Sequence, residues 1–417
     1  MADVALTAED RAILALESET IAGHTCKVIV VGPGAPDHAT LRETIAARIE
    51  SVPALTRRLG GTPEEQLWVR DPGFDPDRHL VEVPVDAPLD GPGLRAEVAR
   101  LFAQHLDRAR PLWRIDAAPL EGGRVALVWR LHHAVADGTT AMRFARELLW
   151  DPEPGGPSAA PAHGQGRAAD EERRRGHLAG FLHREFARSH GRSPFDGEIG
   201  RRRQVEFASV PLAELHAAAK RLDGATVNDA VLATVAGALR RWVEAHHGSL
   251  GTVRVKVPVS LHHEGDSAGN RDSFFTVPLP LNEAQPAARL RAVRLATAER
   301  KADHDADEME ELVQELARVS PRLARFCERL ERSPRRFAVN VSNVPGPRGR
   351  VAIAGAAVES VHSLAEIGER HALRVAVISL AGNLCFGLCA DPALVDDLGA
   401  LAEGIELEAE ALVAAAR

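Results

Sequence analysis

Residues 129–144 read WRLHHAVADGTTAMRF, and they join an apolar run to an amphipathic one. The run before the histidines, residues 124–131, is apolar on both faces, which predicts a β-strand covered on both sides. Residues 139–150 repeat apolar side chains at helical spacing, so we expect a helix there, with Thr139 as a candidate cap. The two histidines therefore lie where a buried strand turns into a helix.

The turn itself holds four residues whose chemistry matters. Adjacent side chains on a strand point to opposite faces, so His132 and His133 are not expected to bind one metal ion together, and no third ligand follows at a suitable spacing. We expect one imidazole to enter a cavity and the other to be part of the structure. Asp137 is expected to cap the helix or to bind an arginine, and Gly138 to relax the backbone. The alternative is that both histidines are satisfied core residues and Asp137 is only a cap.

Two similar patterns elsewhere are not expected to carry chemistry. His262 and Asp266 repeat the H-x-x-x-D spacing, but in a polar stretch without a following helix. Residues 265–269, GDSAG, match the G-x-S-x-G of a nucleophile elbow, which requires a helix directly after the serine. Here a strand-like run follows instead. The sequence therefore does not predict a serine hydrolase.

Composition sets the general class of the protein. The chain has 417 residues, is 45% hydrophobic and carries a formal net charge of -8, which suits two globular domains and gives no global attraction to nucleic acid. The cysteines show no metal-ligand spacing, which favours free thiols in a reducing compartment. The N-terminus lacks the features of a signal peptide, and no run of about 18 apolar residues occurs. We therefore expect a cytoplasmic protein without a membrane span.

The order of strand and helix patterns predicts the domain organisation. Strands and helices alternate in residues 1–150 and again in 204–417, which predicts an α/β (α+β) protein of two domains. Residues 151–203 are rich in proline, glycine and alanine, then in arginine, which indicates a linker or a surface segment. In the second domain Thr226 is expected to cap a helix, and two apolar runs around a turn at 381–383 predict a hairpin.

With these features placed, the chain resembles the bacterial wax ester synthase/diacylglycerol acyltransferase (WS/DGAT) family over nearly its whole length. The resemblance rests on five motifs in the order of the family, each weak alone. They are HHAVADG at 132–138, PLW at 111–113, ND at 228–229, GNR at 269–271 after a VPVS run, and SNVPGP at 342–347.

The resemblance implies a fold and a catalytic residue. The fold would be two chloramphenicol-acetyltransferase-like domains, each a mixed sheet covered by helices, with a tunnel between them. The second histidine of the motif, His133, would be the catalytic base, in a motif completed by His132, Asp137 and Gly138. In the wider CoA-dependent acyltransferase superfamily the motif aspartate turns away from the substrate and pairs with an arginine, so Asp137 would hold the loop.

The resemblance also implies the reaction, which is O-acyl transfer from acyl-CoA to an alcohol or diacylglycerol, forming wax ester or triacylglycerol. Acyl-CoA is then a co-substrate, and no further cofactor, metal or nucleic acid is expected. Such products are nearly insoluble in water, so contact with a membrane or lipid droplet is an open expectation. The apolar face over residues 178–186, set among arginines, is its candidate, unless that face packs on the protein body. The alternatives are a specialised small-molecule alcohol or amine as acceptor, or an inactive lipid-binding member of the family.

Three residues in the other motifs are candidates for substrate binding, namely Asn270, Asn343 and Trp113. The amide of Asn270 could donate to a carbonyl oxygen, although Asn270 could equally be a turn residue. Trp113, in the PLW motif, has pure packing as its alternative. The ND motif has a structural alternative too, because Thr226 with Asp229 forms a T-x-x-D helix start.

Overall fold

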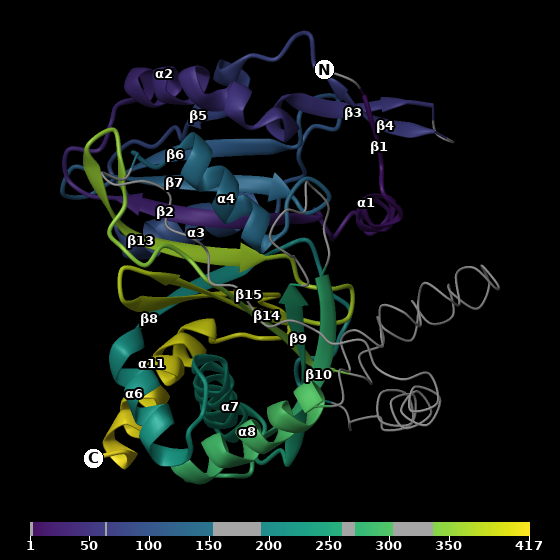
Figure 1. The fold of residues 1–417 in the computed structure, drawn as a ribbon. Helices are drawn as coiled ribbons and strands as arrows, with labels where there is room; N and C mark the ends of the chain where they lie inside the picture. Colours follow the sequence, from purple (N-terminus) through teal and green to yellow (C-terminus); the bar gives the residue numbers. More distant parts are fainter. Residues whose placement is uncertain (1–2, 63–64, 153–192, 261–271, 303–336) are drawn as a thin grey trace.

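The computed structural model describes residues 3–62, 65–152, 193–260, 272–302 and 337–417, and these residues form two large β-sheets, each packed against helices, with the first sheet above the second in Figure 1. Each large sheet is mixed, as the family resemblance implies. The described strands of the first sheet are, in order, β12 (Ala352–Ile353), β13 (Ala356–Ala365), β2 (His24–Val31), β7 (Arg124–His132), β6 (Trp113–Leu120) and β5 (Leu80–Glu82). Neighbours in this sheet are antiparallel, except that β5 and β6 are parallel.

The first sheet is covered on both faces, which explains the continuous apolar strands. In β2, Cys26, Val28 and Val30 enter one core cluster, whereas Ile29 and Val31 enter the other. The covering elements are α2 (His38–Arg48), α3 (Gly91–Phe102) and α4 (Gly138–Leu148), with short 3-10 helices at Ile49–Ser51, Pro53–Thr56 and Pro76–Arg78. A small sheet lies beside them, with α1 (Ala8–Leu14), β1 (Val4–Ala5), β4 (Gln66–Arg70) and β3 (Arg57–Gly61).

The second sheet carries its helices on the side away from the first (Figure 1). Its described strands are, in order, β10 (Asp272–Pro280), β9 (Thr252–Ser260), β11 (Val339–Val344), β14 (Leu373–Leu380), β15 (Asn383–Ala390) and β8 (Gln204–Pro211). Strand β11 is parallel to both of its neighbours, and the other pairs are antiparallel. The helices are α6 (Leu212–Asp223), α7 (Val227–His246), α8 (Pro286–Ala302) and α11 (Leu398–Ala415).

Two local predictions are confirmed in this half. The hairpin joins β14 to β15 through Ala381 and Gly382, whose φ angles of 47° and 91° suit a tight turn with left-handed residues. Helix α7 begins after Thr226, which forms a capping box with Asp229. Asp229 is buried and also accepts a hydrogen bond of 2.6 Å from Oγ1 of Thr297. The ND motif therefore has the capping role that its sequence alternative described.

One feature of the topology was not anticipated from the sequence. Strands β12 and β13 come late in the chain, yet β13 pairs with β2 of the first sheet, with Val361 opposite Ile29. In Figure 1, β13 lies between β2 and the strands β14 and β15. Strands β12 and β13 therefore complete the first sheet, and β13 brings it into contact with the second.

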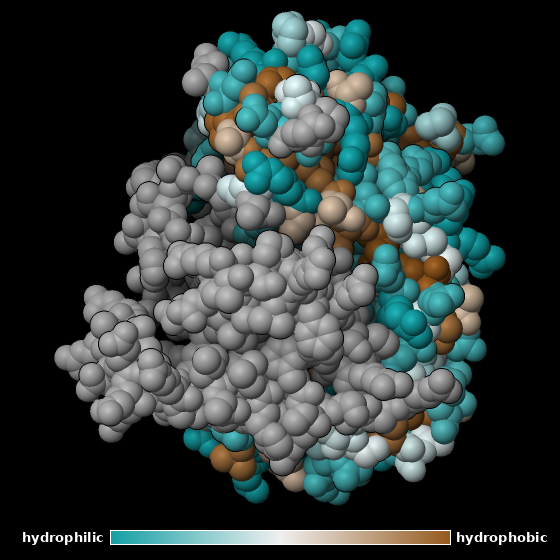
Figure 2. Space-filling model, turned by 90° about the vertical axis from the view of Figure 1, so that its right-hand side faces the viewer, coloured by the Kyte–Doolittle hydropathy of each residue, from teal (hydrophilic) through white to brown (hydrophobic). Residues whose placement is uncertain are grey.

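The surface of the described residues has few large apolar side chains. Those that are exposed are Val4, Leu295 and Leu407, which belong to three different elements. On the face shown in Figure 2, hydrophobic and hydrophilic residues alternate over the upper part of the molecule. Among the described ranges, no helix is both long and apolar enough to cross a membrane.

Candidate active site

The histidine pair lies at the turn between β7 and α4, so the predicted strand, turn and helix are confirmed. Strand β7 ends at His132, and α4 begins at Gly138. The cap of this helix is Asp137, whose Oδ1 accepts a hydrogen bond of 2.6 Å from the backbone N–H of Thr140. The expectation that Thr139 caps the helix was wrong, because the helix starts one residue earlier and places Thr139 inside its first turn.

His132 has a structural environment. Its ring is fully buried, and Nδ1 accepts a hydrogen bond of 3.1 Å from the backbone N–H of Ala134. Its Nε2 lies 2.6 Å from Oε1 of Glu17. Burial opposes ionisation of Glu17, but the contacts with His132 and Arg108 together outweigh it and lower the pKa of that carboxyl group. Because Nδ1 accepts, the proton of a neutral His132 ring belongs on Nε2, facing Glu17.

His133 has a different environment. The residue is partly buried, with Nδ1 of its ring among the buried atoms, and its backbone N–H donates a hydrogen bond of 2.9 Å to the carbonyl oxygen of Gly23. Burial and then the charge of Arg374 lower the pKa of His133 to about 4, and the negative charge of Asp137 opposes this only in part. The imidazole of His133 is therefore neutral near pH 7 and able to accept a proton.

Charged groups from other strands surround the turn. Lys27 of β2 is completely buried, and its Nζ donates a hydrogen bond of 2.6 Å to Oγ of Ser363 on β13. Burial lowers the pKa of Lys27 to about 8, and the nearby negative charge of Asp137 limits that fall. Asp137 thus combines two tasks, because it caps α4 and balances buried positive charge. Pairing of Asp137 with an arginine, which the family resemblance implied, stays a prediction.

Gly138 brings the two halves of the chain into contact. A Cβ atom at this position would lie 2.9 Å from Cγ2 of Val344, at the end of β11, so only glycine fits without movement. Val344 belongs to the SNVPGP segment, and the N–H of Gly346 in that segment donates a hydrogen bond of 3.0 Å to Oγ of Ser379. Two motifs that are some 200 residues apart in the sequence therefore meet beside His133.

We expect Gly138→Ala to lower the free energy of unfolding by about 1–3 kcal/mol, because the new methyl group overpacks against Val344. Adding Val344→Ala should recover most of this loss, since it removes the methyl group in contact. Urea unfolding of both single variants and the double variant measures the coupling. Gly349→Ala is the control, because a Cβ there meets nothing within 4 Å. Strictly additive losses for Gly138 and Val344 would contradict the predicted contact.

Two substitutions of Asp137 distinguish its role as a helix cap from the effect of its negative charge. Asp137→Ala should lower the free energy of unfolding by about 1 kcal/mol more than Asp137→Asn, which keeps a capping oxygen. Asp37→Asn is a matched control, because Asp37 caps α2 in the same way but is exposed. The change should therefore destabilise the protein more at Asp137 than at Asp37. Activity should fall only with the folded fraction, and a fully stable but inactive Asp137→Asn would show a direct chemical role instead.

The three candidate substrate-binding residues have different placements. Trp113 is buried and donates a hydrogen bond of 2.7 Å from its indole N–H to the carbonyl oxygen of Leu55. Its ring stacks on His79, so its surroundings are those expected if Trp113 serves packing and not substrate binding. Asn343 is partly buried on β11, where alternation turns it to the face opposite Val344. Asn270 lies outside the described residues. Substrate contacts of all three stay predictions.

Sequence reasoning missed the charged residues that surround the turn. Lys27 lies directly before the apolar run VIVV in the strand HTCKVIVV, which is a signal that the sequence could have provided. Arg374 lies in a similar run on β14, but only the fold brings it near His133. In the part of the chain that the structure describes, no cluster of histidine, cysteine or carboxylate side chains suits a metal ion.

Comparison with known proteins identifies similar chains over the full length. A family model described as the wax ester synthase/diacylglycerol acyltransferase catalytic domain matches residues 6–184 and 163–231, and one described as the WS/DGAT C-terminal domain matches residues 268–412. A Mycobacterium tuberculosis protein named as a diacylglycerol O-acyltransferase is 31% identical over 465 residues, which cover 99% of this chain and 97% of that one. A second protein of that species with the same assigned activity is 29% identical over 419 residues, or 93% and 90% of the two chains.

Solved structures share the fold. The wax ester synthase/diacylglycerol acyltransferase of Marinobacter aquaeolei VT8 has a TM-score of 0.70 at 22% identity, and 99% of each chain is covered. The starter condensation domain of rhizomide synthetase, solved with C8-CoA, has a TM-score of 0.65 at 14% identity, with 99% and 95% covered. The first condensation domain of the CDA synthetase has a TM-score of 0.64 at 19% identity, with 100% and 97% covered.

Proposed function

Because the chain belongs to the wax ester synthase/diacylglycerol acyltransferase family and is an acyltransferase, we propose that it transfers a fatty acyl group from acyl-CoA to the hydroxyl group of diacylglycerol. Diacylglycerol is placed first among acceptors because the curated relatives are named for it. A fatty alcohol, which would give a wax ester, is the second acceptor. Acyl-CoA as donor is consistent with the C8-CoA bound to a protein of the same fold.

In the proposed reaction His133 is the general base. An alcohol with a pKa of about 16 is hardly ionised at pH 7, so a base must remove its proton while the new C–O bond forms. The imidazole then gives the proton to the sulfur of CoA as the C–S bond breaks, and the products are the ester and free CoA. His133 ends the cycle neutral, and no covalent enzyme intermediate is required.

One observation carries this proposal, which is the position of His133 at the turn where Gly138 of one half of the chain packs against Val344 of the other. Burial and the charge of Arg374 lower its pKa to about 4, so it is a free base at neutral pH. Its backbone is held by Gly23, and Gly138 and Val344 close the site on the side of the second sheet. The developing oxyanion requires hydrogen-bond donors, for which backbone N–H groups near Gly138 and the amide of Asn270 are the candidates.

A single assay tests the proposal and its alternatives. Purified protein is incubated with acyl-CoAs of several chain lengths and separately with diacylglycerol, a fatty alcohol, a small alcohol or an amine. Free CoA is measured, and products are identified by mass. Triacylglycerol formed with release of one CoA per ester supports the proposal. If esters or amides of another acceptor form instead, that compound and not diacylglycerol is the acceptor. Binding of lipid without CoA release would indicate the inactive lipid-binding alternative.

Contact with a lipid surface belongs to the same proposal, because diacylglycerol and triacylglycerol are nearly insoluble in water. The sequence candidate for this contact is the apolar face over residues 178–186. These residues lie outside the described part of the chain, so the contact stays a prediction. It is supported by the helical spacing of Leu178, Phe181, Leu182 and Phe186 among arginines.

A further inference from the structure

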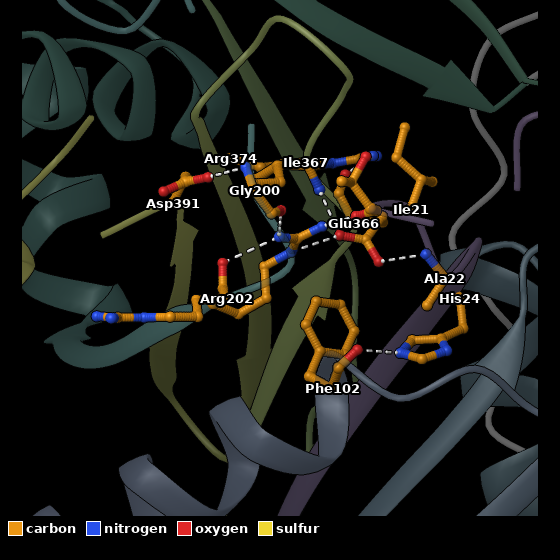
Figure 3. Close-up of polar contacts among 12 residues, drawn as sticks. Ile21, Ala22, His24, Phe102, Gly200, Arg202, Glu366, Ile367, Arg374 and Asp391 are labelled. Atoms are coloured by element: carbon orange, nitrogen blue, oxygen red, sulfur yellow. Dashed lines mark hydrogen bonds and ion pairs between the residues drawn. The ribbon is translucent and has the colours of Figure 1, made fainter. Parts of the chain in front are cut away.

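Three segments that are far apart in the sequence meet at a buried ion pair (Figure 3). Arg203 precedes β8 and Glu366 follows β13, and their side chains are only 1% and 8% exposed. Nε of Arg203 donates a hydrogen bond of 2.9 Å to Oε1 of Glu366. The other carboxylate oxygen of Glu366 accepts a hydrogen bond of 3.2 Å from the backbone N–H of Ala22.

The remaining donors of Arg203 bind backbone carbonyl groups. Its Nη1 donates to the carbonyl oxygens of Gly200 and Arg202, at 2.8 and 3.0 Å. Its Nη2 donates to the carbonyl oxygen of Thr20. Hydrogen bonds from a charged donor are stronger than those between neutral groups. Arg203 and Glu366 together therefore hold the segment 20–22 from both sides.

This segment supports both histidines directly. Gly23 follows Ala22, and its carbonyl oxygen accepts the hydrogen bond of 2.9 Å from the backbone N–H of His133. Its φ of 70° lies in the left-handed region, and a Cβ there would lie 2.8 Å from Nε2 of His132. A small displacement of the segment would therefore move the backbone that fixes His133 and the ring of His132.

Glu366 reaches His133 by a second route, through Arg374. Its backbone carbonyl oxygen accepts a hydrogen bond of 2.9 Å from Nη1 of Arg374. After burial, the charge of Arg374 is the next largest cause of the low pKa of His133. The position of Arg374 relative to the imidazole therefore depends in part on where Glu366 lies.

We propose that the Arg203–Glu366 pair is a positioning element for the histidine turn, which fixes Gly23 and Arg374 so that His133 keeps its place. The catalytic part of this inference rests on the proposed function, whereas its structural part does not. The simpler interpretation is that the pair only stabilises the fold. The chain offers a matched comparison, since Arg289 and Glu408 form a second pair whose side chains are 2% and 3% exposed, among the helices α7, α8 and α11.

The main variant is Arg203→Lys, which keeps the charge but cannot bind Glu366, Gly200 and Thr20 at once. Hydrogen–deuterium exchange with mass spectrometry is followed for peptides that cover residues 20–24 and 129–136. Exchange should become faster in both peptides in Arg203→Lys, and should be unchanged there in Arg289→Lys. This measurement needs no substrate, so it remains informative if the protein proves not to transfer acyl groups.

Turnover supplies the second measurement. In Arg203→Lys, kcat per folded molecule should fall roughly ten- to 10²-fold with KM for acyl-CoA little changed, because a displaced base affects the chemical step. Arg289→Lys should keep the wild-type kcat. The double variant Arg203→Met, Glu366→Leu removes both charges without leaving either one unpaired, and it should show the same local exchange and the same loss. Wild-type exchange and kcat in a folded Arg203→Lys protein would overturn the proposal.

Discussion

Replacing His133 by alanine should lower the rate of CoA release by roughly 10²–10⁴-fold, because the reaction then lacks its general base. The protein should stay folded, since His133 is only partly buried and belongs to none of the hydrophobic core clusters of the described residues. The measurement is CoA release under saturating acyl-CoA and acceptor, with the folded fraction taken from circular dichroism and the melting temperature.

Two other histidines give the comparison that this prediction needs. His216 is exposed on α6, and His216→Ala should keep the wild-type rate and stability. His132 is fully buried and in contact with Glu17 and Ala134, so His132→Ala should mainly lower the melting temperature. If folded His133→Ala retained near wild-type turnover, the imidazole would not be the base and the proposed chemistry would fail.

The features that the sequence predicts correctly depend on residues close together in the chain. The strand, turn and helix around the histidines follow from a run that is apolar on both faces and then changes to helical spacing. The β14–β15 hairpin follows from a two-residue turn between apolar runs, and α7 from its capping box. Even here the boundary of α4 was misplaced, because Thr139 and Asp137 are both acceptable caps and only the backbone decides between them.

The features that the sequence does not predict depend on contacts between residues far apart in the chain. Nothing in the sequence of residues 356–365 indicates that they pair with β2 of the first sheet and not with a strand of the second. The same crossing brings Ser363 to Lys27, and Glu366 to Ala22. A charged residue in an apolar strand shows that a partner is required, but the identity of the partner comes from the tertiary fold.

The candidate site also combines local features, which the sequence predicts, with long-range features, which it does not. The family resemblance proposes His133 as the base, and strand alternation predicts that it and His132 have different environments, so both predictions need no structure. The low pKa of His133 could not be predicted, because Arg374 is more than 200 residues away in the sequence. The contact between Gly138 and Val344 could not be predicted either, although both residues lie in motifs that the sequence singles out.

The pH dependence of the reaction should reflect this environment. Burial and the Arg374 charge lower the pKa of His133 to about 4, so the folded protein binds fewer protons than the unfolded chain between about pH 4 and 6.5. His133 therefore contributes a loss of stability as the pH falls through that range, and none above it. The neutral base persists below pH 6, so kcat/KM should stay on its plateau where an ordinary histidine would already be mostly protonated.

Arg374→Met tests the cause of this shift. Removing the positive charge should raise the pKa of His133 towards its ordinary value, which moves the acid limb of kcat/KM towards neutral pH. At pH 5.5 the variant should lose up to about tenfold relative to its own plateau, whereas the wild type loses little. Comparing each protein with its own plateau removes the effect of lost bonds to Glu366, and Arg70→Met, on an exposed ion pair, controls for the change in net charge. The groups that face His133 besides Arg374 are Asp137 and His132, and they are the same in both proteins. An acid limb near pH 6.5 in the wild type, or one that Arg374→Met leaves in place, would show that His133 does not have the environment described.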